Sequence, residues 1–154
     1  NKYLETQPGP ICNIKGETIG KHDGLSFYTI GQRKGMGIGG LSNSHNKESN
    51  CKPWFVIAKE KSSNTLIVDQ GRDSPHLLKS DLKAIKTSWV SGEPPNFSQI
   101  EAKIRYRQKE FSSSLICSED EFSLRFDTPQ WAVTPGQSAV LYNGLECLGG
   151  GIIS

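Results

Sequence analysis

The chain has 154 residues, which is enough for one ordinary domain or two small ones. Its 18 Lys and Arg residues nearly balance 16 Asp and Glu, so a polybasic nucleic-acid binder is excluded and any nucleic-acid surface must be local. Because no apolar run approaches the roughly 18 residues of a transmembrane helix and no signal-peptide core is present, we expect a cytoplasmic protein without membrane contact.

The predicted elements are short β-strands. Helical spacing of apolar residues is almost absent, whereas short apolar runs bounded by Gly, Pro, Asn and Ser recur. We predict strands at 11–14, 17–19, 54–58, 65–69, 82–90, 97–106, 113–117, 122–126, 139–142 and 145–148. Asn143-Gly144 predicts a type I′ turn between the last two strands, and Pro135-Gly136 predicts a type II turn before them.

A turn-rich segment at residues 71–76 is the predicted boundary between two units. Residues 1–74 would form a small β-rich domain with a Gly-rich basic loop. Residues 75–154 carry the regular succession of strands, which we expect to close into a β-barrel because closure removes exposed edges. The predicted fold class is therefore all-β.

The cysteines and histidines are isolated from one another. No C-x-x-C pair occurs, so we predict reduced, separate thiols and no metal site. The histidines lack partners at ligand spacing and are interpreted as ordinary surface or turn residues. We predict no catalytic residues among the cysteines and histidines, which are Cys12, Cys51, Cys117, Cys147, His22, His45 and His76.

Four cations alternate along the predicted strand at 97–106 and just beyond it: Lys103, Arg105, Arg107 and Lys109. Alternate residues of a strand share one face, which would space these cations by roughly 6.6–6.8 Å. That spacing is close to the separation of phosphates along a nucleic-acid strand. The alternative is the solvated outer face of an edge strand, where cations discourage aggregation.

Residues 31–40 contain five glycines together with Arg33 and Lys34. Glycine lets backbone N–H groups approach a ligand closely, so the segment could contact phosphate. It matches neither a Walker loop nor a dinucleotide fingerprint, and a flexible turn-rich loop is the alternative. Gln137, in the predicted type II turn, could bond a ligand or cap the turn.

Five motifs, in this order, resemble the C-terminal region of the bacterial tRNA-specific 2-thiouridylases. They are the segments at 23–39, 53–56, 103–108, 132–140 and 147–151, including Gly-Gln-Arg-Lys-Gly-Met-Gly, Pro-Trp-Phe-Val, Lys-Ile-Arg-Tyr-Arg-Gln, Thr-Pro-Gly-Gln-Ser and Cys-Leu-Gly-Gly-Gly. The resemblance covers residues 3 to 153. It implies an enzyme with an N-terminal ATP-pyrophosphatase domain, a central β-rich domain, and a C-terminal barrel like the second domain of translation elongation factors.

The resemblance also implies the chemistry of the whole enzyme. Such an enzyme adenylates C2 of the wobble uridine at tRNA position 34 and then transfers sulfur from a persulfide cysteine, giving 2-thiouridine. ATP and magnesium serve the activation, and a sulfur-relay protein charges the cysteine. An older name calls the family a methyltransferase, which this chemistry does not support.

This chain departs from the whole enzyme in two respects. It has no S-G-G-x-D-S phosphate loop, and its four cysteines match neither catalytic position of the family. We therefore expect these 154 residues alone to bind no cofactor and not to thiolate tRNA.

The family's tRNA contacts carry over to Arg105, Tyr106 and Gln137. Contact of both Arg105 and Tyr106 with RNA requires a strand end or a bulge, because neighbours on a regular strand point apart. Tyr106 could then stack on an unpaired base, or alternatively pack in the core. We also expect Arg33, Lys34, Lys103 and Arg107 near the RNA backbone or the missing active site. The alternative function is a structural module that docks on the nucleotide domain with little RNA affinity.

Overall fold

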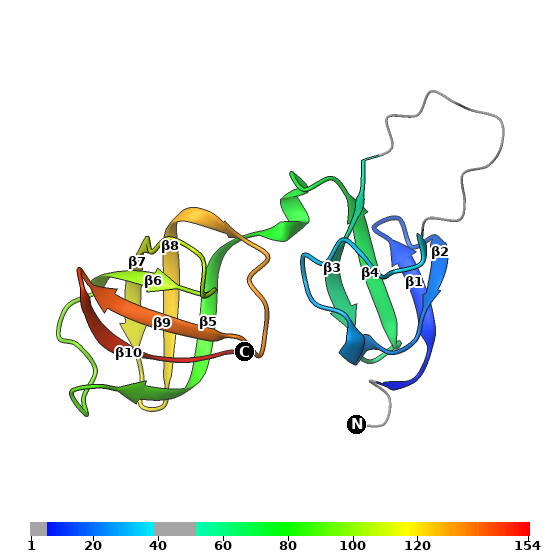
Figure 1. The fold of residues 1–154 in the computed structure, drawn as a ribbon. Coiled ribbons are helices and arrows are strands. Elements are labelled where there is room, and N and C mark those ends of the chain that lie inside the picture. The colour runs from blue at the N-terminus through cyan, green and yellow to red at the C-terminus, as the bar shows by residue number, and fades with distance from the viewer. Residues whose placement is uncertain (1–5, 39–51) are drawn as a thin grey trace. The chain divides into compact units, whose positions relative to one another are not determined.

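The computed structural model describes residues 6–38 and 52–154. The chain divides into two compact units, Asn1–Leu77 and Leu78–Ser154. Strands dominate both units, so the predicted all-β class is confirmed (Figure 1). Within residues 6–38 and 52–154, no helix is both long and apolar enough to cross a membrane.

The first unit is built on a four-stranded sheet. Its strands are β1 (Gly9–Asn13), β2 (Thr18–His22), β3 (Trp54–Glu60) and β4 (Thr65–Gln70), in the order β2-β1-β4-β3. The β1–β2 and β3–β4 pairs are antiparallel hairpins formed by strands that the sequence predicts, and β1 pairs with β4 in parallel (Figure 1). The parallel pair therefore joins the two hairpins into one sheet.

The core of the first unit combines strand residues with the segment that follows β2. Ile11, Val56 and Leu66 contribute fully buried side chains from three strands. Leu25, in the short 3-10 helix η2 (Leu25–Phe27), and Met36 are buried in the same cluster. The segment after β2 thus stabilises the sheet by burying apolar surface against it.

The second unit is a closed antiparallel barrel of six strands, as predicted. After the 3-10 helix η4 (Pro75–Leu77), its strands run around the barrel in the order β10-β5-β8-β7-β6-β9 (Figure 1). Closure pairs β10 with both β5 and β9. The strand bounds are β5 Leu78–Trp89, β6 Gln99–Lys103, β7 Phe111–Cys117, β8 Glu121–Trp131, β9 Ser138–Asn143 and β10 Glu146–Ile153.

Glycines allow β10 to lie close against both of its neighbours. A Cβ atom on Gly149, whose φ is +146°, would lie 2.2 Å from the carbonyl oxygen of Ser88. A Cβ atom on Gly150 would lie 2.4 Å from the carbonyl oxygen of Ala139. Barrel closure therefore requires residues without a side chain at these two positions.

The last hairpin forms as predicted, but its turn is shifted by one residue. Asn143 pairs with Glu146, so Gly144 and Leu145 are the central residues of the turn. Gly144 has φ +59°, whereas Leu145 is not among the residues with positive φ. A positive φ at the first central residue alone is typical of a type II′ turn. The predicted type I′ turn at Asn143-Gly144 is therefore wrong.

Candidate nucleic-acid interface

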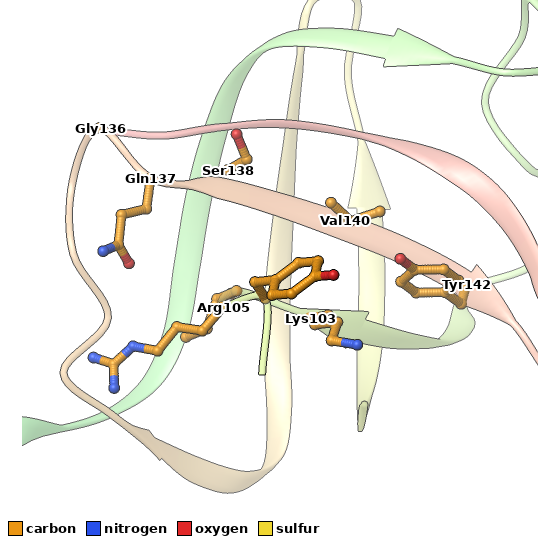
Figure 2. Close-up of a pocket in the computed structure, with 9 residues that line it drawn as sticks. Lys103, Arg105, Gly136, Gln137, Ser138, Val140 and Tyr142 are labelled. Atoms are coloured by element: carbon orange, nitrogen blue, oxygen red, sulfur yellow. The ribbon is translucent and has the colours of Figure 1, made fainter. Parts of the chain in front are cut away.

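A groove of about 650 Å³ opens on the barrel unit, where the end of β6 approaches the start of β9 (Figure 2). Three of its walls come from the turn after β6, the turn before β9, and the outer face of β9. The residues that line it are Lys103, Ile104, Arg105, Tyr106, Gly136, Gln137, Ser138, Val140 and Tyr142. The groove thus brings together Lys103 and the three residues that the resemblance assigned to tRNA contact.

Strand β6 ends earlier than the sequence predicts, and this places Arg105 and Tyr106 at the groove. The strand stops at Lys103, and the backbone N–H of Gln108 donates to the carbonyl oxygen of Arg105 at 3.1 Å, forming a turn. The predicted row of four cations on one strand face is therefore wrong. Lys103 and Arg105 line the groove, whereas Arg107 and Lys109 are exposed and are not among its lining residues.

The Arg105 side chain is held in place by the end of β8. Its guanidinium lies 5.1 Å from the ring centre of Trp131, and its Nη2 donates to the carbonyl oxygen of Ala132 at 2.8 Å. The same carbonyl accepts a hydrogen bond from Thr134 Oγ1 at 2.9 Å. The cation–π contact with Trp131 and the hydrogen bond to the Ala132 carbonyl together restrict the position of the guanidinium.

The Tyr106 ring is 93% exposed, so its alternative role in core packing is excluded. Tyr142, on the outer face of β9, is half-buried and lines the same groove. An exposed aromatic face is the surface on which unpaired bases stack in RNA-binding proteins. The groove therefore offers one fully accessible ring and a second, partly covered one.

Gln137 lies in a tight turn whose geometry agrees with the predicted type II. Gly136 follows Pro135 with φ +88°, and the backbone N–H of Gln137 donates to the carbonyl oxygen of Thr134 at 3.3 Å. The side-chain Oε1 of Gln137 is buried and accepts no hydrogen bond from the described residues. This oxygen therefore does not cap the turn. A buried acceptor without a donor is costly, and a ligand N–H or O–H group would satisfy it.

Lys103 forms an ion pair at the groove. Its Nζ lies 3.2 Å from Glu110 Oε1, and both side chains are partly exposed. The pKa of the Glu110 carboxyl is lowered mainly by a hydrogen bond from its own backbone N–H. The hydrogen bond and positive charge of Lys103 lower it further. The carboxylate partly compensates the charge of Lys103, so a phosphate at this place would compete with Glu110.

The Gly-rich basic segment belongs to the first unit, where residues 31–38 form a turn against β3. The backbone N–H of Gly31 donates to the carbonyl oxygen of Val56 at 2.7 Å, and the Val56 N–H donates to the Gln32 carbonyl at 3.0 Å. The Gln32 side chain accepts from the Thr29 N–H and donates to the Lys34 carbonyl. These bonds favour the turn interpretation for residues 31–38. Residues 39 and 40 lie outside the described part of the chain.

Arg33 and Lys34 are both exposed in this turn. They belong to the first unit, whereas the groove lies on the barrel unit. Their predicted position near the RNA backbone therefore stays a prediction.

The described thiols are free, and one histidine differs from the prediction. Cys12 and Cys117 are half-buried and Cys147 is exposed; burial raises the pKa of the Cys117 thiol. His22 is fully buried, so its predicted surface position is wrong. Its Nε2 lies 3.0 Å from the carbonyl oxygen of Asn64, to which it donates. His76 is exposed, as predicted, whereas Cys51 and His45 lie outside the described residues.

The groove is also lined by Ser138, Val140 and Tyr142, which were not predicted as site residues from the sequence. The available signal was alternation, because these three positions of β9 point outward while Ala139 and Leu141 are fully buried. Recognition of Tyr142 as a groove residue also needed the β6–β9 pairing, in which it faces Glu101.

Two protein-family models match the chain. The tRNA methyl transferase PRC-barrel domain matches residues 1–70, and the aminomethyltransferase β-barrel domain matches residues 79–153. Together they cover most of both units.

Several bacterial enzymes are similar in sequence to this chain over nearly its whole length. The tRNA-specific 2-thiouridylase MnmA of Janthinobacterium sp. (strain Marseille) and that of Herminiimonas arsenicoxydans are each 53% identical over 154 residues, 100% of this chain and 41% of theirs. The enzyme of the same name from Burkholderia thailandensis is 54% identical over 161 residues, covering 99% of this chain and 40% of its own length. The chain thus spans about two fifths of these relatives. These matches confirm the resemblance seen in the motifs: the chain belongs to the tRNA-specific 2-thiouridylase family and corresponds to the β-barrel domains of its C-terminal portion.

Proposed function

We propose that this chain is the tRNA-binding part of a cytoplasmic enzyme that thiolates C2 of the wobble uridine of tRNA. The printed names of its relatives support the reaction, and the groove on the barrel supports the binding role. We also propose the division into a central domain at residues 1–74 and a barrel domain at residues 75–154. The family-model matches at 1–70 and 79–153 favour this division.

One observation carries the proposed binding role. One groove is lined by an exposed aromatic residue, two cations, and a buried acceptor that finds no donor among the described residues: Tyr106, Lys103, Arg105 and Gln137. RNA offers a partner for each of them, because it carries stacking bases, phosphates, and N–H groups on its base edges. With a net charge of only +2, we expect the isolated chain to bind tRNA weakly.

The groove suits an unpaired nucleotide better than a paired one. Stacking on Tyr106 needs a free base face, and the Gln137 oxygen needs a base N–H that is not already used in a pair. The fixed guanidinium of Arg105 supplies positive charge without further ordering of its side chain. Lys103 would reach a phosphate by exchanging its partner Glu110 for it.

The remaining chemistry belongs, in this proposal, to the three fifths of the relatives that the chain does not span. ATP and magnesium would act in an N-terminal ATP-pyrophosphatase domain, and a sulfur-relay protein would charge its cysteine. The 154 residues have no S-G-G-x-D-S phosphate loop to hold ATP. We therefore keep the prediction that this chain alone is inactive.

A structural role for the barrel is the second candidate, and the contacts of Arg105 favour it. The guanidinium packs on Trp131 and bonds to the Ala132 carbonyl, so it stabilises the barrel wall without any RNA. In this alternative, the units dock on the nucleotide domain and shape its pocket. The residues of the groove would then contribute to stability but not to tRNA affinity.

Filter binding of tRNA to the full-length enzyme distinguishes the two candidates. Gln137→Leu removes the buried acceptor, and we expect at least about a fivefold loss of affinity without any loss of stability in urea unfolding. Gln99→Leu is the matched control, because Gln99 is exposed on β6 and is not among the groove residues. Equal affinities of the wild type and Gln137→Leu would contradict this binding role for the groove.

A second pair of variants tests the charge. Arg105→Ala should weaken tRNA binding and reduce its salt dependence, because fewer counterions are released from phosphate. Lys83→Ala removes an exposed cation of β5 and should leave both unchanged. If Arg105→Ala lowers the unfolding free energy but not the affinity, the structural candidate is correct.

A further inference from the structure

A second groove lies on the barrel unit, between the loop after β5 and the first residues of β10. Its volume is about 290 Å³, and its apolar lining residues are Val90, Pro95, Phe97 and Leu148. Small-molecule sites have volumes of roughly 300–1,000 Å³. This groove is therefore large enough for one apolar side chain and too small for a nucleotide cofactor.

The groove is preformed by hydrogen bonds within the described residues. The Val90 N–H donates to the Leu148 carbonyl at 3.0 Å and extends the pairing of β5 with β10. The Gly92 N–H donates to the Trp89 carbonyl at 3.1 Å, and Ser91 Oγ donates to the Glu93 carbonyl at 2.8 Å. Binding would thus require little ordering of the loop, which lowers its entropic cost.

Large apolar side chains are exposed around this groove. Val90, which is 74% exposed, and Phe97, which is 39% exposed, both line it. Exposed apolar side chains that gather at a groove mark sites of interaction more often than single ones do. The barrel core does not account for them, because the buried residues of that core do not include them.

Two carboxylates give this groove its charge. Glu93 and Glu146 line it and are exposed, and neither forms an ion pair with the described residues. Its lining includes no Lys or Arg, in contrast to the groove of Lys103 and Arg105. Carboxylates repel phosphate and attract ammonium or guanidinium groups, so the charge disfavours RNA and favours a cationic partner.

We propose that this groove docks a protein segment in which an aliphatic or aromatic side chain stands beside a lysine or arginine. The apolar side chain lies against Val90, Phe97 and Leu148, and the neighbouring cation pairs with Glu93 or Glu146. The site is separate in its residues and in its charge from the proposed RNA groove.

Titration of the ¹⁵N-labelled chain with short peptides, followed by NMR, tests this site. Acetyl-Lys-Leu-Phe-Lys-amide should shift the amide signals of Val90, Ser91, Cys147 and Leu148 in a saturable way. The same peptide with Glu in place of both Lys should bind at least about fivefold more weakly, which is the scale of two exposed ion pairs. The peptide with Gly-Gly in place of Leu-Phe should not bind.

Two charge reversals complete the test. Glu146→Lys should weaken binding of the Lys-Leu-Phe-Lys peptide at least fivefold. Glu121→Lys, at an exposed position outside the groove at the start of β8, should not. Dispersed amide signals report that each variant is folded. No saturable shift at millimolar peptide, equal binding of the acidic peptide, or equal effects of both reversals would overturn the proposal. Shifts of the same signals by an RNA oligonucleotide instead would also overturn it.

Discussion

The variant Tyr106→Ala tests the proposed RNA binding without disturbing the fold, because Tyr106 lines the groove and is 93% exposed. Replacement by Ala at such a site changes the free energy of unfolding by less than about 0.5 kcal/mol. Loss of a base–aromatic stack costs about 1–3 kcal/mol of binding free energy. We therefore expect the Kd of the full-length enzyme for tRNA to rise about 5- to 150-fold in Tyr106→Ala.

The assay is filter binding at one fixed salt concentration, since phosphate contacts make the affinity depend on salt. Tyr106→Phe keeps the aromatic face and should bind within about twofold of the wild type. Urea unfolding of both variants should match the wild type. If Tyr106→Ala binds tRNA as tightly as the wild type, base stacking at this residue is refuted. If Tyr106→Phe loses as much affinity as Tyr106→Ala, the hydroxyl and not the ring is responsible.

Three further predictions concern the charge of the groove and the barrel. Glu110→Gln releases Lys103 from its 3.2 Å ion pair and should strengthen tRNA binding about two- to threefold. Because the pKa of Glu110 is lowered, its ion pair with Lys103 is lost only as the pH falls through that lowered value. The gain in tRNA affinity should therefore not vary with pH near neutrality. Weaker tRNA binding by Glu110→Gln would contradict the proposed exchange of Glu110 for phosphate. Gly149→Ala puts a Cβ atom 2.2 Å from the Ser88 carbonyl oxygen and should lower the free energy of unfolding, measured in urea, by about 2–5 kcal/mol; a loss below about 1 kcal/mol would contradict this packing. Phe122→Ala removes a core ring that is 1% exposed and should cost about 3–5 kcal/mol in the same measurement, whereas unchanged stability would place that ring outside the core.

Local patterns predicted the strands well because most of them bury one face. In β9, buried Ala139 and Leu141 alternate with less buried neighbours, and this period of two is visible in the sequence. The parallel pairing of β1 with β4 could not be predicted in the same way. It joins residues far apart in the chain, such as Ile11 and Leu66, and no local signal encodes their partnership.

Strand ends and turns were harder to predict than strands. The sequence 97–106 alternates suitably throughout, yet β6 stops at Lys103. Arg105 then finds Trp131 and the Ala132 carbonyl, contacts that exist only once β8 is in place. The β9–β10 turn is likewise set by non-local contacts. It is centred on Gly144-Leu145 because the pairing of β9 with β10, and not the Asn-Gly dipeptide alone, determines its register.

The candidate site could be predicted in part. The resemblance to the family selected Arg105, Tyr106 and Gln137, and the fold places all three on one groove. Tyr142 was missed because its place beside them depends on the antiparallel pairing of β6 with β9. The buried position of His22 was missed too. It depends on a hydrogen bond to the Asn64 carbonyl, 42 residues away in the chain.

An NMR titration of the ¹⁵N-labelled chain with tRNA tests most directly whether this groove binds tRNA. We expect shifts at Arg105, Tyr106 and Gln137, which line the proposed RNA groove, and none at Val90 or Glu93. The shifts at the RNA groove should diminish as salt is added. Shifts that leave Arg105, Tyr106 and Gln137 unchanged while other surfaces respond would contradict the claim that this groove binds tRNA.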